Sequence, residues 1–261
     1  MSALEIAAIL LAGLGAGAIN SVVGSGTIIT FSTLLAFGVP PVVANISNSL
    51  GVVPGSVTGA YGYRRELTGQ RARVGRLLVA SVLGGIVGAA LLMLLPPGAF
   101  EAIVPALILL GVVLVILGPR LSEAVARRAE KRGDETGSDA GWVWPAVFGG
   151  AIYGGYFGAA QGVILMAMLG IGVQEPLQRL NGIKNVLVAA ANLVAGIVFV
   201  VVSWVGWSEA EVDWLIVLLI GVGAFAGGLL GSSYGRKLPP NVLRAFIVVV
   251  GLAAVVAMLV T

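Results

Sequence analysis

The sequence contains no cysteine and no histidine among its 261 residues. Without cysteine, the chain has no disulfide bonds, no thiolate metal sites and no thiol nucleophile. Without histidine, it lacks the side chain that most often acts as a general base or metal ligand near neutral pH. These two absences exclude most familiar catalytic centres and metal sites, so we expect no cofactor.

Charged residues are also scarce. They make up 10% of the chain, whereas hydrophobic residues make up 58%, and the mean hydropathy is +1.04. Soluble domains carry about 25% charged residues because polar side chains must cover their surface. The composition therefore excludes a soluble enzyme, a nucleic-acid-binding protein and a disordered chain. The net charge of +3 indicates no nucleic-acid partner, because basic residues in membrane proteins orient the loops. The expected surroundings are membrane lipid.

Long apolar segments alternate with short polar loops along the whole chain. A helix needs about 20 apolar residues to cross a bilayer. Segments 27–38 and 162–172 are too short to cross as straight helices. The sequence predicts an all-α polytopic membrane protein with about 8–10 membrane segments. The predicted apolar segments are about 3–23, 27–38, 41–63, 76–95, 99–118, 142–158, 162–172, 177–204, 213–235 and 241–260.

Basic residues are concentrated in three loops, which predict the orientation of the chain. The positive-inside rule places such loops in the cytoplasm. The loops around Pro96 and Glu211 lack Lys and Arg, so we place them, and both chain termini, outside. We interpret the arginine clusters as topology signals and lipid contacts. They comprise Arg64, Arg65, Arg71, Arg73 and Arg76; Arg120, Arg127, Arg128, Lys131 and Arg132; and Arg236, Lys237 and Arg244.

A polar cytoplasmic linker, residues 119–141, divides the chain into two membrane halves, 1–118 and 142–261. The halves match weakly but in order, and the matched loops fall on opposite sides of the membrane under the positive-inside rule. We therefore predict two inverted-topology repeats, a plan typical of secondary transporters. At an offset of 136 residues, the aligned pairs are Gly26 with Gly162, Pro40 with Pro176, Asn45 with Asn181, Asn48 with Lys184, and Ser49 with Asn185.

Each half contains a short segment that glycine interrupts at the corresponding position. The first reads INSVVGSGTIITF and breaks at Gly24-Ser25-Gly26, and the second reads GGYFGAAQGVILM and breaks near Gly158 to Gly162. Paired breaks of this kind are the best sequence pointer to a transporter binding site. A helix that restarts at Gly26 or Gly162 directs backbone N–H groups at the break, which suits an anion. The alternative is that these glycines only allow helices to pack closely.

A stripe of polar side chains follows each break. Asn45 and Asn48 are three residues apart, as are Asn181 and Lys184, so each pair shares a helix face. A charge at bilayer depth costs about 2.5–3.5 kcal/mol on insertion scales, and we interpret Lys184 as a cationic ligand for an anionic substrate. The alternatives are that Lys184 snorkels to the cytoplasmic interface or forms an ion pair with Glu175.

The predicted substrate site combines the two breaks with the two polar stripes. It has no metal ligands and no catalytic residues. Its members are Gly24, Ser25, Gly26, Asn45, Asn48, Ser49, Gln161, Gly162, Asn181, Lys184 and Asn185.

The residues around the breaks resemble a known family. The stretches GAINSVVGSGTIITFSTLLAFGVPPVVANISNS and GGYFGAAQGVILMAMLGIGVQEPLQRLNGIKN look like the TauE/SafE family of sulfite exporters, and the resemblance extends over nearly the whole chain. It implies a carrier in the bacterial inner membrane that exports sulfite, thiosulfate or sulfonates. By that likeness, the matching motif positions are Gly24, Gly26, Asn45 and Asn48 in the first half, and Asn181, Lys184 and Asn185 in the second.

This chain departs from the family pattern at two positions. It has Ser25 between two glycines where many relatives show a run of glycines, and Asn rather than Thr at position 48. Both departures leave the exact anion open. The predicted function is secondary transport of a small sulfur-containing anion by alternating access, with a homo-oligomer as one possible state. The alternatives are an anion channel that uses the same residues and an intramembrane enzyme, for which the usual catalytic cluster is missing.

Overall fold

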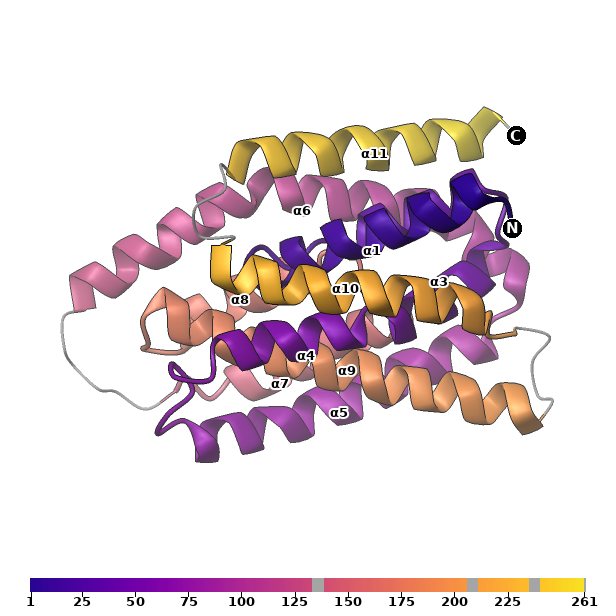
Figure 1. The fold of residues 1–261 in the computed structure, drawn as a ribbon. Helices are drawn as coiled ribbons and strands as arrows, with labels where there is room; N and C mark the ends of the chain where they lie inside the picture. The colour runs from indigo at the N-terminus through magenta and orange to yellow at the C-terminus, as the bar shows by residue number, and fades with distance from the viewer. Residues whose placement is uncertain (133–138, 206–210, 235–239, 261) are drawn as a thin grey trace.

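The computed structural model describes the chain except for residues 133–138, 206–210, 235–239 and 261. The described residues form helices and no strands (Figure 1), which confirms the all-α prediction. The helices are α1 (Ala3–Val22), α2 (Thr27–Ala36), α3 (Pro41–Gly51), α4 (Val53–Gly62), α5 (Arg71–Leu94), α6 (Pro97–Arg132), α7 (Val143–Tyr156), α8 (Gln161–Gly172), α9 (Leu177–Val205), α10 (Trp214–Tyr234) and α11 (Pro240–Val260).

The outer surface of the bundle is apolar, as a lipid environment requires. Large hydrophobic side chains such as Leu94, Leu218 and Val249 are exposed on several helices. Five helical stretches in the described residues are long and apolar enough to cross a membrane: Ala3–Val22, Arg71–Leu94, Gly98–Arg120, Leu177–Val205 and Trp214–Ser233. At 1.5 Å per residue, the 20 residues of α1 extend about 30 Å, the thickness of the hydrocarbon core.

The two short segments form helical hairpins that enter the bundle from opposite ends. The α1–α2 hairpin starts at the end that holds the N-terminus, and α3 begins near the same end (Figure 1). The α7–α8 hairpin starts at the other end, where the N–H of Ala140 donates to the carbonyl oxygen of Gly172 at 2.9 Å. The 10 residues of α2 and the 12 of α8 extend only about 15–18 Å. Neither short helix therefore crosses the bundle alone.

Helices from each half of the chain pack against helices from the other half. Helix α1 packs along α10, and α7 packs along α5; likewise α4 packs on α10, and α9 packs on α5. We call α1, α3, α4 and α10 the first bundle, and α5, α7 and α9 the second bundle. Each bundle therefore contains helices from both halves of the chain.

Glycine allows the backbones within each bundle to touch. A Cβ atom on Gly17 of α1 would lie 2.7 Å from the Cα of Ala224 in α10, and one on Gly88 of α5 would lie 2.7 Å from the backbone nitrogen of Tyr156. Such small-residue seams are typical of tight helix packing in membranes, where dispersion contacts replace the hydrophobic effect. Each bundle is therefore closely joined along its length.

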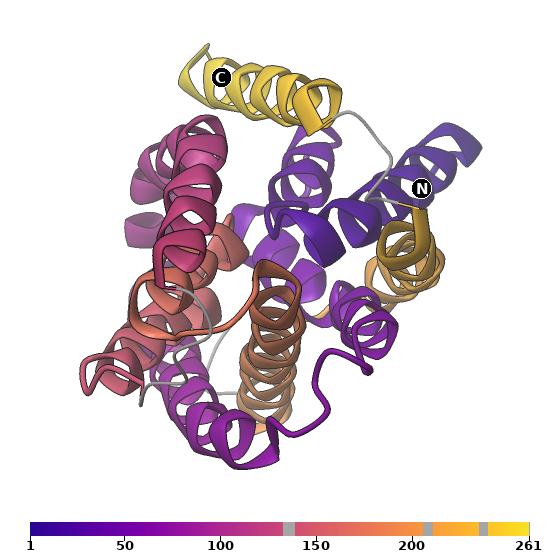
Figure 2. The same cartoon turned by 90° about the vertical axis from the view of Figure 1, so that its left-hand side faces the viewer.

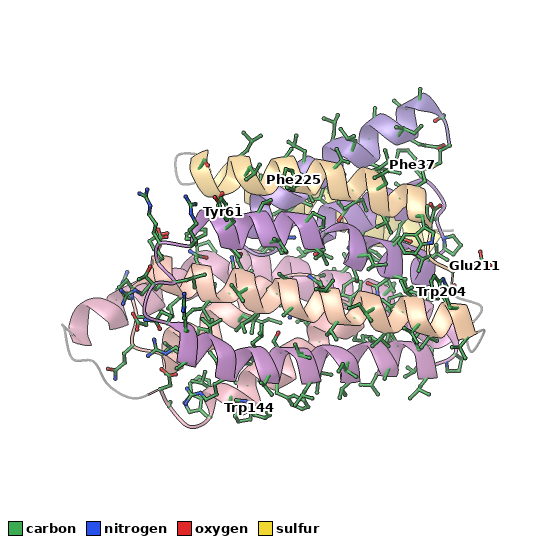
Figure 3. All side chains as sticks on the ribbon, turned by 60° about the horizontal axis from the view of Figure 1, so that its bottom comes forward. Phe37, Tyr61, Trp144, Trp204, Glu211 and Phe225 are labelled. Atoms are coloured by element: carbon green, nitrogen blue, oxygen red, sulfur yellow. The ribbon has the colours of Figure 1, made fainter. Side chains whose placement is uncertain are left out.

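The two ends of the bundle carry different loops and helix ends. Both chain ends lie at one end of the bundle, whereas the α4–α5 loop and the C-terminal end of α6 lie at the other (Figure 1). Figure 3 places Trp204 and Glu211 at the first end and Tyr61 towards the second. Figure 2, which looks along the helices, shows α11 at the rim, where it packs on α6 and α2.

Two helices differ from simple spans. The segment predicted at 41–63 is divided at Val52, because Pro54 lacks the N–H that would continue the helix. Helix α9, which the predicted repeat aligns with this segment, contains no proline and runs unbroken. Helix α6 continues through Pro105 and Pro119 to Arg132, so the first part of the predicted linker is an extension of a membrane helix.

Candidate substrate site

The two helix breaks meet in the interior of the bundle. The N–H of Gly162 donates to the carbonyl oxygen of Gly24 at 3.1 Å. Gly24 has a φ of +87°, and Ala160, 136 residues later, has a φ of 58°. A Cβ atom on Gly24 would lie 2.5 Å from the Cα of Gly162. These glycines therefore allow close packing, as the alternative interpretation expected, and the backbones that they bring together are the two helix breaks themselves.

Side chains and backbone of the protein already engage two of the N–H groups at the breaks. The side-chain oxygen of Asn20 accepts from the N–H of Gly26 at 2.6 Å, and Gly24 accepts from Gly162. The second restarted helix begins at Gln161, next to Gly162. These two N–H groups hold the breaks in shape, so any ligand must rely mainly on other donors.

Lys184 is completely buried, with none of its surface exposed. Its Nζ donates to the carbonyl oxygen of Asn20 and to Oδ1 of Asn181, both at 3.2 Å. The bond to Asn181 confirms that the two side chains share a face of α9. Both acceptors are neutral, so the structure gives Lys184 polar contacts but no countercharge among the described residues.

Both alternative interpretations of Lys184 are wrong. A snorkelling side chain would reach solvent, whereas Lys184 is enclosed. Glu175 is held instead by Arg73 at 2.5 Å and by Arg179 at 2.8 Å. Burial alone would raise the pKa of Glu175, but hydrogen bonds from Arg179, Arg73 and Gln70 outweigh it and hold the pKa below its ordinary value.

Amide side chains link each break to the opposite bundle. Nδ2 of Asn185 in α9 donates to the carbonyl oxygen of Ser21 at 3.1 Å, at the end of α1. Nδ2 of Asn45 in α3 donates to the carbonyl oxygen of Tyr156 at 2.9 Å, at the end of α7. A carbonyl at a helix end has no partner within its own helix and needs a donor. Each polar stripe therefore supplies one hydrogen-bond donor to the helix end at the break of the other half.

Several buried polar atoms of the predicted site residues have no hydrogen-bond partner among the described residues. They include both amide atoms of Asn48 and of Gln161, the hydroxyl of Ser25 and Oδ1 of Asn45. Ser49, next to Asn48, is also buried. An unpaired buried polar group costs about 1–3 kcal/mol, so each of these atoms needs a partner that a ligand or water can supply.

Two supporting residues were absent from the predicted site. Asn20 contributes its side-chain oxygen to Gly26 and its backbone oxygen to Lys184. The hydroxyl of Tyr153 donates to the carbonyl oxygen of Ala159 at 2.6 Å and so supports the second break. The sequence signal for Asn20 is an isolated amide in an apolar run, six residues before Gly26.

Comparison with known proteins identifies the family. A family model described as sulfite exporter TauE/SafE matches residues 9–258. The chain belongs to the TauE/SafE family. It is therefore a membrane transporter, and the resemblance noted in the sequence is confirmed. No solved structure matches the chain.

Relatives of this TauE/SafE protein are named as transporters. Probable membrane transporter protein ORF9 of Sinorhizobium is 25% identical over 97% of this chain and 92% of its own length. Probable membrane transporter protein YfcA of Escherichia coli is 26% identical over 90% of this chain and 82% of its own length. A probable membrane transporter protein of Haemophilus influenzae is 23% identical over 89% of this chain and 84% of its own length.

Proposed function

We propose that this TauE/SafE protein exports small sulfur-containing anions, such as sulfite, thiosulfate or organosulfonates, across the bacterial inner membrane. The observation that carries the proposal is Lys184, a fully buried basic side chain with only neutral partners beside the helix breaks. Isolated buried charge is costly. An oxyanion at this position supplies the missing negative charge, so the site favours anionic substrates.

The neighbouring side chains supply hydrogen bonds that suit an oxyanion. Nδ2 of Asn48, Nε2 of Gln161 and the hydroxyl of Ser25 are buried donors without partners among the described residues. Hydrogen bonds to a charged group contribute about 1.5–3 kcal/mol each. Several such bonds to the oxygens of one anion, together with Lys184, compensate for the loss of its hydration.

The two halves act in this proposal as inverted repeats. The packing of α1 on α10 has its counterpart in α7 on α5, and the two hairpins enter from opposite ends. The contacts of Lys184 with Asn20 and of Asn45 with Tyr156 both cross between the first and second bundles. Rocking of one bundle against the other opens the site to each side in turn.

The basic end of the protein faces the cytoplasm in this proposal, as the positive-inside rule requires. The membrane potential then favours outward movement of negative charge by about 2.3 kcal/mol per charge per 100 mV. The membrane potential therefore favours export for any transport cycle that carries net negative charge outward.

Counterflow in proteoliposomes tests the proposal. Vesicles loaded with unlabelled sulfite are expected to accumulate labelled sulfite transiently through the wild-type protein, with saturation at high concentration. Lys184→Ala is expected to reduce this exchange by at least about tenfold, since the loss of one charged hydrogen bond is about 1.5–3 kcal/mol. Lys131→Ala, the same change in the linker, is the matched control and is expected to exchange normally.

Two results would overturn this proposal. Exchange by the Lys184→Ala variant at the rate of the Lys131→Ala control would remove Lys184 from the site. Conductance that does not saturate, without counterflow, would replace the carrier by an anion channel.

A further inference from the structure

Two carboxylates lie on described elements that contact α9: Glu5 at the start of α1, and Glu66 in the α4–α5 loop, whose Leu67 packs at Gly182. Helices α1, α3, α4, α5, α7 and α8 pack against α9. Helices α3 and α8 contain no titratable residue. The other helices contain the following titratable residues: Glu5 at the start of α1; Tyr61 in α4 and Tyr63 just after it; Arg71, Arg73 and Arg76 in the first turns of α5; Tyr153 and Tyr156 in α7; and Arg179 in α9 itself.

The hydrogen bonds of Lys184 Nζ in the described residues go to the neutral oxygens of Asn20 and Asn181, and neither carboxylate is among these partners. Glu5 caps the opposite end of α1, where it accepts a hydrogen bond from the backbone of Ser2. Glu175, which precedes α9, is held by Arg73 and Arg179. Because both contacts of Nζ are neutral, the net charge of this group of side chains changes with the proton on Nζ and with any anion bound beside it.

The number of hydrogen-bond acceptors around Nζ matches the uncharged amine. The structure provides two, the carbonyl oxygen of Asn20 and Oδ1 of Asn181. A neutral amine has two N–H donors, whereas an ammonium has three. The third N–H of the ammonium has no acceptor among the described residues, and an unpaired buried donor is costly. An oxyanion at the site supplies both that acceptor and the countercharge.

We infer that Lys184 is a proton-binding site that couples the transport of the anion to a proton moving in the same direction; this inference rests on the proposed function. On the loading side, the lone pair of Nζ takes a proton from water as the anion binds. On the other side, the anion leaves and the proton returns to water. The unloaded carrier then reverses with a neutral amine and two satisfied N–H groups.

This coupling fixes the charge that each transport cycle moves. A monovalent sulfonate and its proton move as a neutral pair, so the rate of net transport does not respond to the membrane potential. Divalent thiosulfate with one proton moves one net negative charge. By linkage, the proton raises the affinity for the anion by the same factor as the anion raises the affinity for the proton.

Calorimetry of the purified protein measures directly whether a proton is taken up when the anion binds. Thiosulfate is the probe because it takes up no proton itself near neutral pH. Titrations in buffers with different ionisation enthalpies give the number of protons bound with each anion, and we expect about one at alkaline pH for the wild type. Lys184→Arg is expected to bind thiosulfate with no proton uptake, because a guanidinium does not lose its proton in proteins. Lys131→Arg is the matched control and keeps the uptake.

A flux measurement tests the same coupling with the wild-type protein alone, so its result does not depend on whether a variant folds. Proteoliposomes with an internal pH indicator are expected to show one proton entering with each thiosulfate. Binding or flux of thiosulfate without proton uptake, at every pH from about 6 to 9, would overturn the coupling and leave the proposed function intact. Absence of binding and flux for sulfite, thiosulfate and sulfonates would overturn both.

Discussion

Replacement of Gly24 by alanine tests the contact between the two helix breaks. Gly24 has a φ of +87°, and a residue with a Cβ pays about 1–2 kcal/mol in that conformation. The new methyl group would also lie 2.5 Å from the Cα of Gly162. Relief of such overpacking costs about 1–3 kcal/mol, so Gly24→Ala is expected to lower the free energy of unfolding by about 2–5 kcal/mol.

Gly38→Ala is the control that separates the cost of the positive φ from the cost of the contact with Gly162. Gly38 has a similar φ of +75°, but a Cβ atom there would have no atom within 4 Å. We expect this control to lose only the conformational part, about 1–2 kcal/mol. Unfolding in detergent micelles, followed by tryptophan fluorescence, measures both variants. Equal stabilities for the two variants would refute the account of the crossed breaks.

Two further predictions concern the basic end and the movement of the bundles. The lowered pKa of Glu175 stabilises the fold above the ordinary carboxyl pKa, and this contribution disappears as pH falls through the lower folded-state value. Glu175→Gln is therefore expected to lower the melting temperature at neutral pH and to weaken its acid dependence; an unchanged pH profile would contradict the contacts with Arg73 and Arg179. The double variant Leu50→Cys and Gly196→Cys links α3 to α9, since a Cβ on Gly196 would lie 3.8 Å from the Cα of Leu50. Oxidation is expected to stop anion exchange and reduction to restore it, whereas full exchange by the oxidised protein would exclude movement between the two bundles.

Most of the helices were predictable because hydropathy and glycine placement act locally. Apolar length predicted the spans within a few residues, and the glycines at positions 24 and 26 predicted the first break. The interruption between α3 and α4 has a local cause as well, because Pro54 has no backbone N–H. The extension of α6 to Arg132 was less clear, because a polar segment with helical composition leaves the end of a membrane helix undefined.

The partners of the polar residues were much less predictable. The spacing of Asn181 and Lys184 predicts a shared face, and the structure joins them. The acceptor on Asn20 lies 164 residues away in sequence, and nothing local specifies that backbone contact. The same holds for Glu175, whose proximity to Lys184 in sequence suggested an ion pair that the packing of α5 gives to Arg73 instead.

The location of a bound substrate analogue tests the central claim most directly. A structure of the protein with selenate, whose selenium is located by anomalous scattering, shows where the anion binds. We expect the selenium beside Lys184 Nζ, with oxygens within hydrogen-bonding distance of Asn48 or Gln161. Selenate bound only at the arginine cluster near Arg73, with no selenium signal beside Lys184, would contradict the account.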